Sequence, residues 1–190
     1  DVPRHRVVIN LAPADVRKEG RAIRQRVGYI AQQFALPQDM SVMENMRFFA
    51  RVYGVSRADQ RRRIAELLDF AGLGGFTDRL AGRLSGGMKQ KLGLACTLVR
   101  PPRLLLLDEP TVGVDPVSRR ELWSIVYRQV QEQGMSVLLS TAYLDEAERC
   151  DEVILMHAGE RLGQGSPASF SAPMRGRTFR VTAPGLGKRA

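Results

Sequence analysis

Four consecutive leucines at positions 104–107, followed directly by an Asp-Glu-Pro sequence, constrain the fold more than any other feature of this chain. A strand with apolar side chains on both faces is typical of a parallel sheet that helices cover. Apolar stretches that also predict strands lie at residues 27–31, 135–140 and 152–157. Because helical patterns separate these stretches, the sequence indicates the α/β class, with a parallel sheet flanked by helices.

Composition excludes several classes of protein. The chain has 190 residues, is 44% hydrophobic and 26% charged, and these values are typical of a globular domain. No apolar run approaches the roughly 18 residues of a membrane span, and the N-terminus lacks the apolar region of a secretory signal. The two cysteines, Cys96 and Cys150, fit a reducing compartment and two separate packing thiols better than a disulfide framework.

The net charge of +9 is unevenly distributed along the chain. Residues 64–163 carry 11 basic and 14 acidic side chains, so the middle of the chain is net acidic and the basic excess lies at the ends. An arginine-rich chain invites a nucleic-acid interpretation, but a basic excess without a nucleic-acid-binding motif is weak support for it. We therefore expect no nucleic-acid partner, and we interpret the arginines as solvated side chains or as neighbours of anionic lipid.

Capping residues predict where the helices begin and end. Ser41 followed by Glu44 is a capping box, in which the hydroxyl and the carboxylate satisfy free N–H groups of the first turn. A second helix is predicted to start near Ser56. A third starts at Asp115, which precedes a proline at the first helical position, and ends at Gly134.

A serine and two glycines, Ser85-Gly86-Gly87, open another predicted helix. The free N–H groups and the positive end of a helix attract anions, and glycine lets a phosphate approach the backbone closely. A plain serine-capped helix explains this segment equally well when it is considered alone.

Two adjacent carboxylates, Asp108 and Glu109, follow the leucine strand. Ligands of open α/β sheets bind at the carboxyl ends of the strands. An Asp there can hold the magnesium of a nucleotide, and a neighbouring Glu can orient or deprotonate a water that attacks a phosphoryl group. The alternative is a strand that ends in a solvated acidic turn.

These segments together make residues 20–165 resemble the nucleotide-binding domain of the ABC (ATP-binding cassette) family, with its motifs in the family's order. Gln32 resembles the Q-loop glutamine, residues 84–90 the signature motif, residues 104–108 the Walker B strand and residues 113–115 the D-loop. The resemblance implies ATP and Mg²⁺ as cofactors. It implies Glu109 and Gln32 as catalytic residues, Asp108 and Gln32 at the metal, and nucleotide contacts from Ser85, Gly86, Gly87, Gln90 and Asp115.

The sequence departs from the family's pattern in two places. It contains no G-x-x-x-x-G-K-[ST] phosphate loop, and its one Gly-Lys pair, Gly187-Lys188, is followed by Arg189. We therefore expect a chain truncated before the Walker A loop, which by itself does not bind ATP measurably. The second departure is Ala142, which stands where the family has its switch histidine.

The resemblance also implies a domain organisation, with the fold of a P-loop NTPase and an inserted α-helical subdomain. The β-subdomain and the Walker A segment are expected to be largely missing. Four parts are expected. Residues 1–32 are a remnant of the N-terminal core that ends in the Q-loop, and residues 33–83 are a helical subdomain. Residues 84–165 are a core half with the signature, the Walker B strand, the D-loop and a degenerate H-loop, and residues 166–190 are a basic C-terminal extension or linker.

The function that the resemblance implies is the ATP-hydrolysing subunit of an ABC transporter, of the drug-export type, peripheral on the cytoplasmic face of the cell membrane. Its expected partners are a second nucleotide-binding domain and a membrane permease that contacts residues 33–83. One alternative is a non-catalytic cassette that supplies its signature motif to a partner's ATP site. Another is a soluble ABC ATPase of translation or DNA maintenance, although residues 33–83 lack the heptads of a long coiled coil.

Overall fold

The computed structural model describes residues 18–33 and 35–174. It divides into two units, residues 1–140 and residues 141–190. Most of the expected N-terminal remnant, at 1–17, and the end of the expected C-terminal extension, at 175–190, lie outside the described residues.

A parallel sheet of three strands forms the centre of the first unit. Its strands are β1 (Val27–Ile30), β2 (Leu104–Asp108) and β3 (Ser136–Ser140), in the order β1-β2-β3. The leucine strand β2 is therefore central, which explains why it is apolar on both faces. The α/β class and the parallel sheet predicted from the sequence are confirmed.

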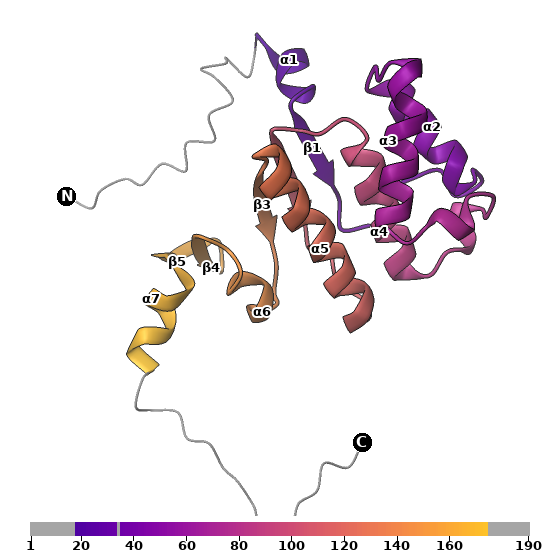
Figure 1. Cartoon of the computed structure of the whole chain (residues 1–190). Coiled ribbons are helices and arrows are strands. Elements are labelled where there is room, and N and C mark those ends of the chain that lie inside the picture. The colour runs from indigo at the N-terminus through magenta and orange to yellow at the C-terminus, as the bar shows by residue number, and fades with distance from the viewer. Residues whose placement is uncertain (1–17, 34, 175–190) are drawn as a thin grey trace, which may run out of the picture. The chain divides into compact units, whose positions relative to one another are not determined.

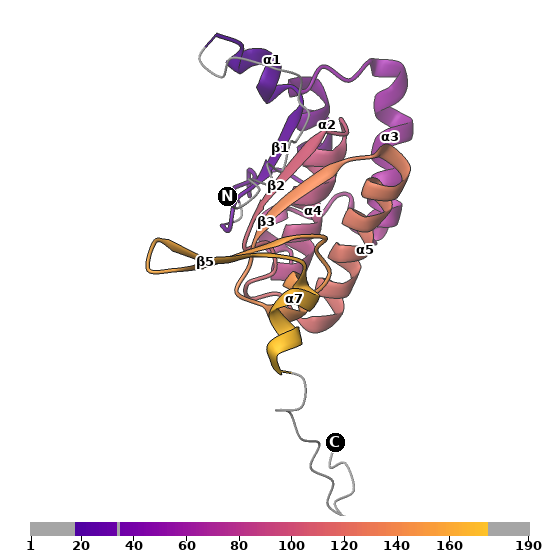
Figure 2. The same ribbon diagram turned by 90° about the vertical axis from the view of Figure 1, so that its left-hand side faces the viewer.

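Two long helices, α4 (Gly86–Leu98) and α5 (Pro116–Gln133), pack on one face of this sheet, as Figure 2 shows. Helix α4 is buried along most of its length. It approaches β1 so closely that a Cβ atom on Gly28 would lie 2.6 Å from Cγ2 of Thr97, so only glycine fits there. The C-terminal half of α4 is therefore packed closely against the beginning of β1.

Two further helices, α2 (Val42–Val52) and α3 (Arg57–Phe70), lie beside α4 (Figure 1). The capping box at Ser41 and the serine cap at Ser56 both form as predicted. The buried Asn45 side chain donates to the carbonyl oxygens of residues 37, 40 and 41, and so fixes the loop that enters α2. The unit also contains α1 (Gly20–Arg24) and the 3-10 turns η1 (Gly74–Phe76) and η2 (Ala81–Arg83).

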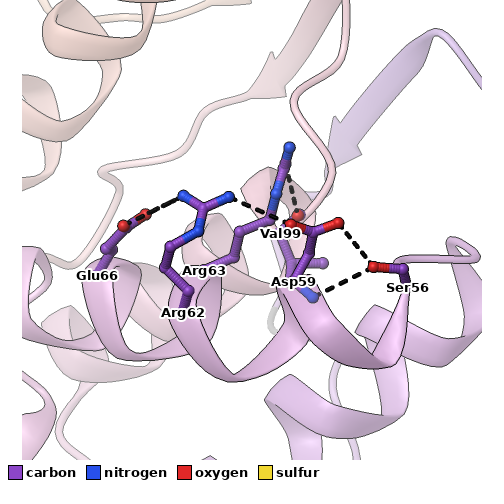
Figure 3. A network of polar contacts seen from close by, with 6 residues as sticks. All are labelled: Ser56, Asp59, Arg62, Arg63, Glu66 and Val99. Carbon is purple, nitrogen blue, oxygen red and sulfur yellow. Dashed lines mark hydrogen bonds and ion pairs between the residues drawn. The ribbon is translucent and has the colours of Figure 1, made fainter.

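The arginine-rich surface of α3 is held by interactions within the fold (Figure 3). Arg62 bridges Asp59 and Glu66 on the same exposed helix face, with nitrogen–oxygen distances of 3.3 Å. Arg63 donates to the carbonyl oxygen of Val99 at 3.3 Å and so connects α3 to the end of α4. These contacts support the interpretation of the arginines as solvated, structural side chains.

The second unit begins with α6 (Leu144–Ala147) and continues into a hairpin of β4 (Val153–His157) and β5 (Glu160–Gly165). Helix α7 (Pro167–Ser171) and the turn η3 (Ala172–Met174) follow. The Thr141 hydroxyl donates to the buried carboxylate of Glu146 at 2.6 Å. Among the described residues of both units, no helix is long and apolar enough to cross a membrane.

Candidate functional site

The carboxyl ends of β2 and β3 bring the first part of the site together. The strand register places Asp108 directly opposite Ser140. The Ser140 hydroxyl donates to Oδ1 of Asp108 at 2.7 Å, and the oxygen of this hydroxyl accepts the N–H of Glu109 at 3.2 Å. The carbonyl oxygen of Ser140 accepts that N–H as well, at 3.1 Å. The carboxylate of Asp108 and the backbone N–H of Glu109 are thus both hydrogen-bonded to the end of the neighbouring strand.

Glu109 has an unusual backbone conformation. Its φ angle is 44°, in the left-handed region, which costs a non-glycine residue about 1–2 kcal/mol. Such strain persists only where surrounding contacts enforce it, and it concentrates at functional sites. The resulting direction of the side chain places its carboxylate 2.6 Å from the amide nitrogen of Gln32, which donates to it. The structure thereby brings together Gln32, Asp108 and Glu109.

The predicted anion site lies at the start of α4. Ser85 caps this helix by accepting the N–H of Met88 at 3.3 Å. Ser85 and Gly86 are exposed, and α4 has no acidic side chain in its first turn, so nothing in that turn repels an anion. Gly87, in contrast, is buried against α5, where an added Cβ atom would lie 2.4 Å from the Ser118 hydroxyl oxygen.

Asp115 caps α5 on the same side of the unit. Its carboxylate accepts the N–H groups of Val117 at 3.1 Å and Ser118 at 2.9 Å. These hydrogen bonds, with the backbone N–H of Ser118 contributing most, lower the pKa of the Asp115 carboxyl below its ordinary value of 3.8. The acid is therefore ionised at neutral pH and held at the start of α5, close to Gly87.

Gln90, predicted to contact the nucleotide, has a buried side chain that contacts Gln32. Its side chain is buried, and its amide donates to the carbonyl oxygen of Gln32 at 3.4 Å. It therefore joins α4 to the main chain at the predicted Q-loop. A nucleotide contact from Gln90 stays a prediction.

Sequence reasoning missed two polar pairs. The nearly buried ammonium of Lys91 on α4 lies 2.8 Å from the Glu121 carboxylate on α5. No sequence signal joins these two residues, because they are 30 positions apart on different helices. Ser140 was also missed as a site residue, although a polar residue that ends a strand next to β2 was a usable signal.

The donor set is suited to magnesium and nucleotide phosphates. Mg²⁺ takes one or two carboxylates from a protein and completes its octahedron with waters and phosphate oxygens. Asp108 and the side-chain oxygen of Gln32, the two ligands predicted from the sequence, are donors of this kind, and both residues bond to neighbours at the end of the sheet. Within residues 18–33 and 35–174 no three His, Cys, Asp or Glu side chains form a metal-binding group.

Ala142 belongs to the second unit, two positions after the end of β3. The turn around it is well ordered by hydrogen bonds, because the Thr141 hydroxyl accepts the N–H of Tyr143 at 3.0 Å. A methyl group at position 142 can neither accept a proton nor donate a hydrogen bond. Position 142 therefore contributes no proton-handling side chain to this segment.

A parallel sheet with carboxylates at its carboxyl edge, beside a glycine-rich helix start, defines the class of α/β nucleotide-binding domains. Comparison with known families makes this specific. The profile of the ABC transporter family matches residues 5–112, which is more than half of the chain. The chain belongs to this family.

Relatives and solved structures agree with this assignment. The chain is 52% identical over 175 residues to the probable multidrug ABC transporter ATP-binding protein YbhF of Escherichia coli, and the match covers 92% of this chain and 30% of that protein. It is 37% identical over 168 residues to the daunorubicin/doxorubicin resistance ATP-binding protein DrrA of Streptomyces peucetius, covering 88% of this chain and 51% of that protein. The chain thus spans between about a third and about half of these relatives' lengths.

A third relative is the Nod factor export ATP-binding protein I of Burkholderia orbicola. It is 40% identical over 160 residues, with 84% of this chain and 52% of that protein covered. Among solved structures, the ATP-binding subunit of an ABC transporter superimposes with a TM-score of 0.74 at 29% identity, covering 85% of this chain and 68% of that one.

Proposed function

We propose that this chain is part of the ATP-binding and ATP-hydrolysing subunit of an ABC exporter. The observation that carries the proposal is the convergence of Gln32, Asp108 and Glu109 at the carboxyl edge of the sheet. The names of the relatives, which include multidrug export, Nod factor export and daunorubicin/doxorubicin resistance, support export as the direction of transport. Because the chain is shorter than these relatives, activity is proposed for the whole protein.

Each site residue has a role in this proposal. The Asp108 carboxylate and the Gln32 side-chain oxygen would hold Mg²⁺, which when bound neutralises developing charge on the transferred phosphoryl group. The Glu109 carboxylate orients an attacking water and accepts its proton, while the amide of Gln32 holds that carboxylate in place. The free N–H groups at Ser85, Gly86 and Gly87 bind phosphate oxygens of a nucleotide held by a second cassette. Asp115 keeps that helix junction fixed.

Two partners belong to the proposal. One is a second nucleotide-binding domain, because the signature and the Walker B carboxylates would serve different ATP sites. The other is a membrane permease that contacts residues 33–83, with the subunit peripheral on the cytoplasmic face of the membrane. Exposed apolar side chains on α2, Phe48 at 42% and Val52 at 60%, support a protein contact on that segment.

The test is Glu109→Gln in the full protein, with the equivalent residue of any second cassette replaced first so that hydrolysis reports this site. We expect ATP binding to be retained and hydrolysis to fall by about 10²- to 10⁴-fold, because the carboxylate base is lost. Glu132→Gln is a matched control, since Glu132 is a half-exposed carboxylate that pairs with Arg128 on α5. Equal hydrolysis by the wild type and Glu109→Gln would refute the role of Glu109.

A second function, a slow or non-catalytic cassette that presents its signature to a partner's ATP site, is favoured by one observation, Ala142. The whole protein would then have an asymmetric pair of ATP sites. Under this proposal Ala142→His raises turnover at this site by about 10²-fold, because it restores a proton-handling side chain. Absence of any gain counts against the proposal. If the full protein sediments with ribosomes and not with membranes, the result would favour a soluble ATPase of translation.

A further inference from the structure

The Ser140 hydroxyl forms hydrogen bonds to both carboxylate residues that follow one another at the end of β2. It donates to Oδ1 of Asp108 at 2.7 Å and accepts the N–H of Glu109 at 3.2 Å. We propose that Ser140 is a positioning residue for ATP hydrolysis, which holds Asp108 and Glu109 in their working orientations. The proposal rests on the proposed function, because it assigns a role within the same site.

The direction of these hydrogen bonds follows from chemistry. An ionised carboxylate can only accept, and a backbone N–H can only donate, whereas a hydroxyl has one proton and two lone pairs. The Ser140 proton must therefore point at Asp108, and one of its lone pairs must point at Glu109. This orients Oδ1 of Asp108 toward β3. Among the described residues Oδ2 has no partner, so it is the oxygen left for a ligand.

The same serine also enforces the strained backbone of Glu109. Two oxygens of Ser140, the carbonyl at 3.1 Å and the hydroxyl at 3.2 Å, share the N–H of Glu109. With this N–H held, the left-handed φ angle of 44° directs the carboxylate of Glu109 to the amide of Gln32. A shift of the peptide would move the proposed base away from the water that it activates, and misplacement on the scale of 1 Å strongly reduces rate.

A purely structural role explains the serine less well. Ser140 is exposed, so its hydroxyl satisfies no buried group and contributes nothing to the apolar core. Without a functional neighbour it could bind water as well as it binds Asp108. Groups that orient metal-binding carboxylates differ from such exposed hydroxyls, because their loss typically lowers metal affinity or activity by about 10- to 100-fold.

The test compares three variants in the full protein. Ser140→Ala removes the hydroxyl, Ser140→Thr keeps it, and Ser136→Ala makes the same change at the other, exposed end of β3. We expect Ser140→Ala to lower kcat by about 10- to 100-fold with KM for ATP unchanged. Ser140→Thr and Ser136→Ala are expected to keep the wild-type kcat, and all three variants to keep the wild-type thermal unfolding midpoint.

A second readout does not depend on turnover. Mn²⁺ binding in the presence of a non-hydrolysable ATP analogue, measured by electron paramagnetic resonance, is expected to weaken by about 10- to 100-fold in Ser140→Ala only. Wild-type values for Ser140→Ala in both measurements, or equal losses in Ser140→Ala and Ser140→Thr, would overturn the role of Ser140 alone. A wild-type protein that neither hydrolyses ATP nor binds the analogue would overturn this role and the proposed function together.

Discussion

Replacing Gly87 by alanine tests the junction between the signature helix and the helix that follows the D-loop. An added Cβ atom would lie 2.4 Å from the hydroxyl oxygen and 2.5 Å from the Cβ atom of Ser118. Ordinary contacts begin near 3.4 Å, so the helices must separate by almost 1 Å. Rotation of the hydroxyl relieves only the first contact. Overpacking of this kind costs about 1–3 kcal/mol.

Gly93 provides the matched control, because it lies in the same helix and a Cβ atom there meets nothing within 4 Å. Alanine is a better helix former than glycine by about 1 kcal/mol in a helix interior. We therefore expect Gly93→Ala to raise the free energy of unfolding by up to about 1 kcal/mol and Gly87→Ala to lower it. Urea unfolding of the full protein, followed by circular dichroism, measures both changes.

The opposite signs of these two changes are the decisive result. Equal stabilisation by Gly87→Ala and Gly93→Ala would refute the packing of Gly87 against Ser118. A double variant tests the contact itself, because Ser118→Gly removes the two closest atoms that the new methyl group meets and leaves only Oδ2 of Asp115, at 3.3 Å. The cost of Gly87→Ala should then largely disappear in the Ser118→Gly background.

Two further predictions concern charge. The hydrogen-bonded Asp115 carboxyl has a lowered pKa in the folded state. The ionised carboxylate therefore stabilises the fold fully above pH 3.8, the ordinary pKa of the group, and this stabilisation is lost as the pH falls through the folded pKa. The unfolding midpoints of the wild type and Asp115→Asn should therefore converge at acidic pH, and a difference that stays constant with pH would contradict this. Glu121→Gln should destabilise the fold by about 1–3 kcal/mol in urea unfolding, because it leaves the Lys91 ammonium, with 9% of its side chain exposed, without its partner. Glu66→Gln, which breaks the exposed pair with Arg62, should cost less than about 0.5 kcal/mol, and equal costs would contradict the distinction.

Local chemistry explains which parts of the fold the sequence could predict. The helix starts at Ser41, Ser56, Ser85 and Asp115 were predicted from side chains that bond to N–H groups two or three residues ahead, and each of these bonds forms. The central strand was predictable because burial on both faces leaves a continuous apolar run. Each of these signals lies within a few residues of chain.

Contacts between distant segments could not be predicted in the same way. The pairs Lys91–Glu121 and Ser140–Asp108 join residues 30 and 32 positions apart. Their existence depends on how α4 packs on α5 and on the register of β2 with β3, which are set by the packing of many apolar side chains. The sequence identified Asp108 and Glu109 as functional candidates but contained no local sign of the left-handed backbone at Glu109.

The contacts of Gln32 suggest how this site responds to its surroundings. Its amide holds the Glu109 carboxylate, and its carbonyl oxygen accepts from Gln90 of the signature helix. Gln32, the second residue after β1, thus links the proposed base of one ATP site with the helix that would complete another. The hydrogen bonds Gln90–Gln32 and Gln32–Glu109 therefore form a continuous link between α4 and the proposed catalytic carboxylate.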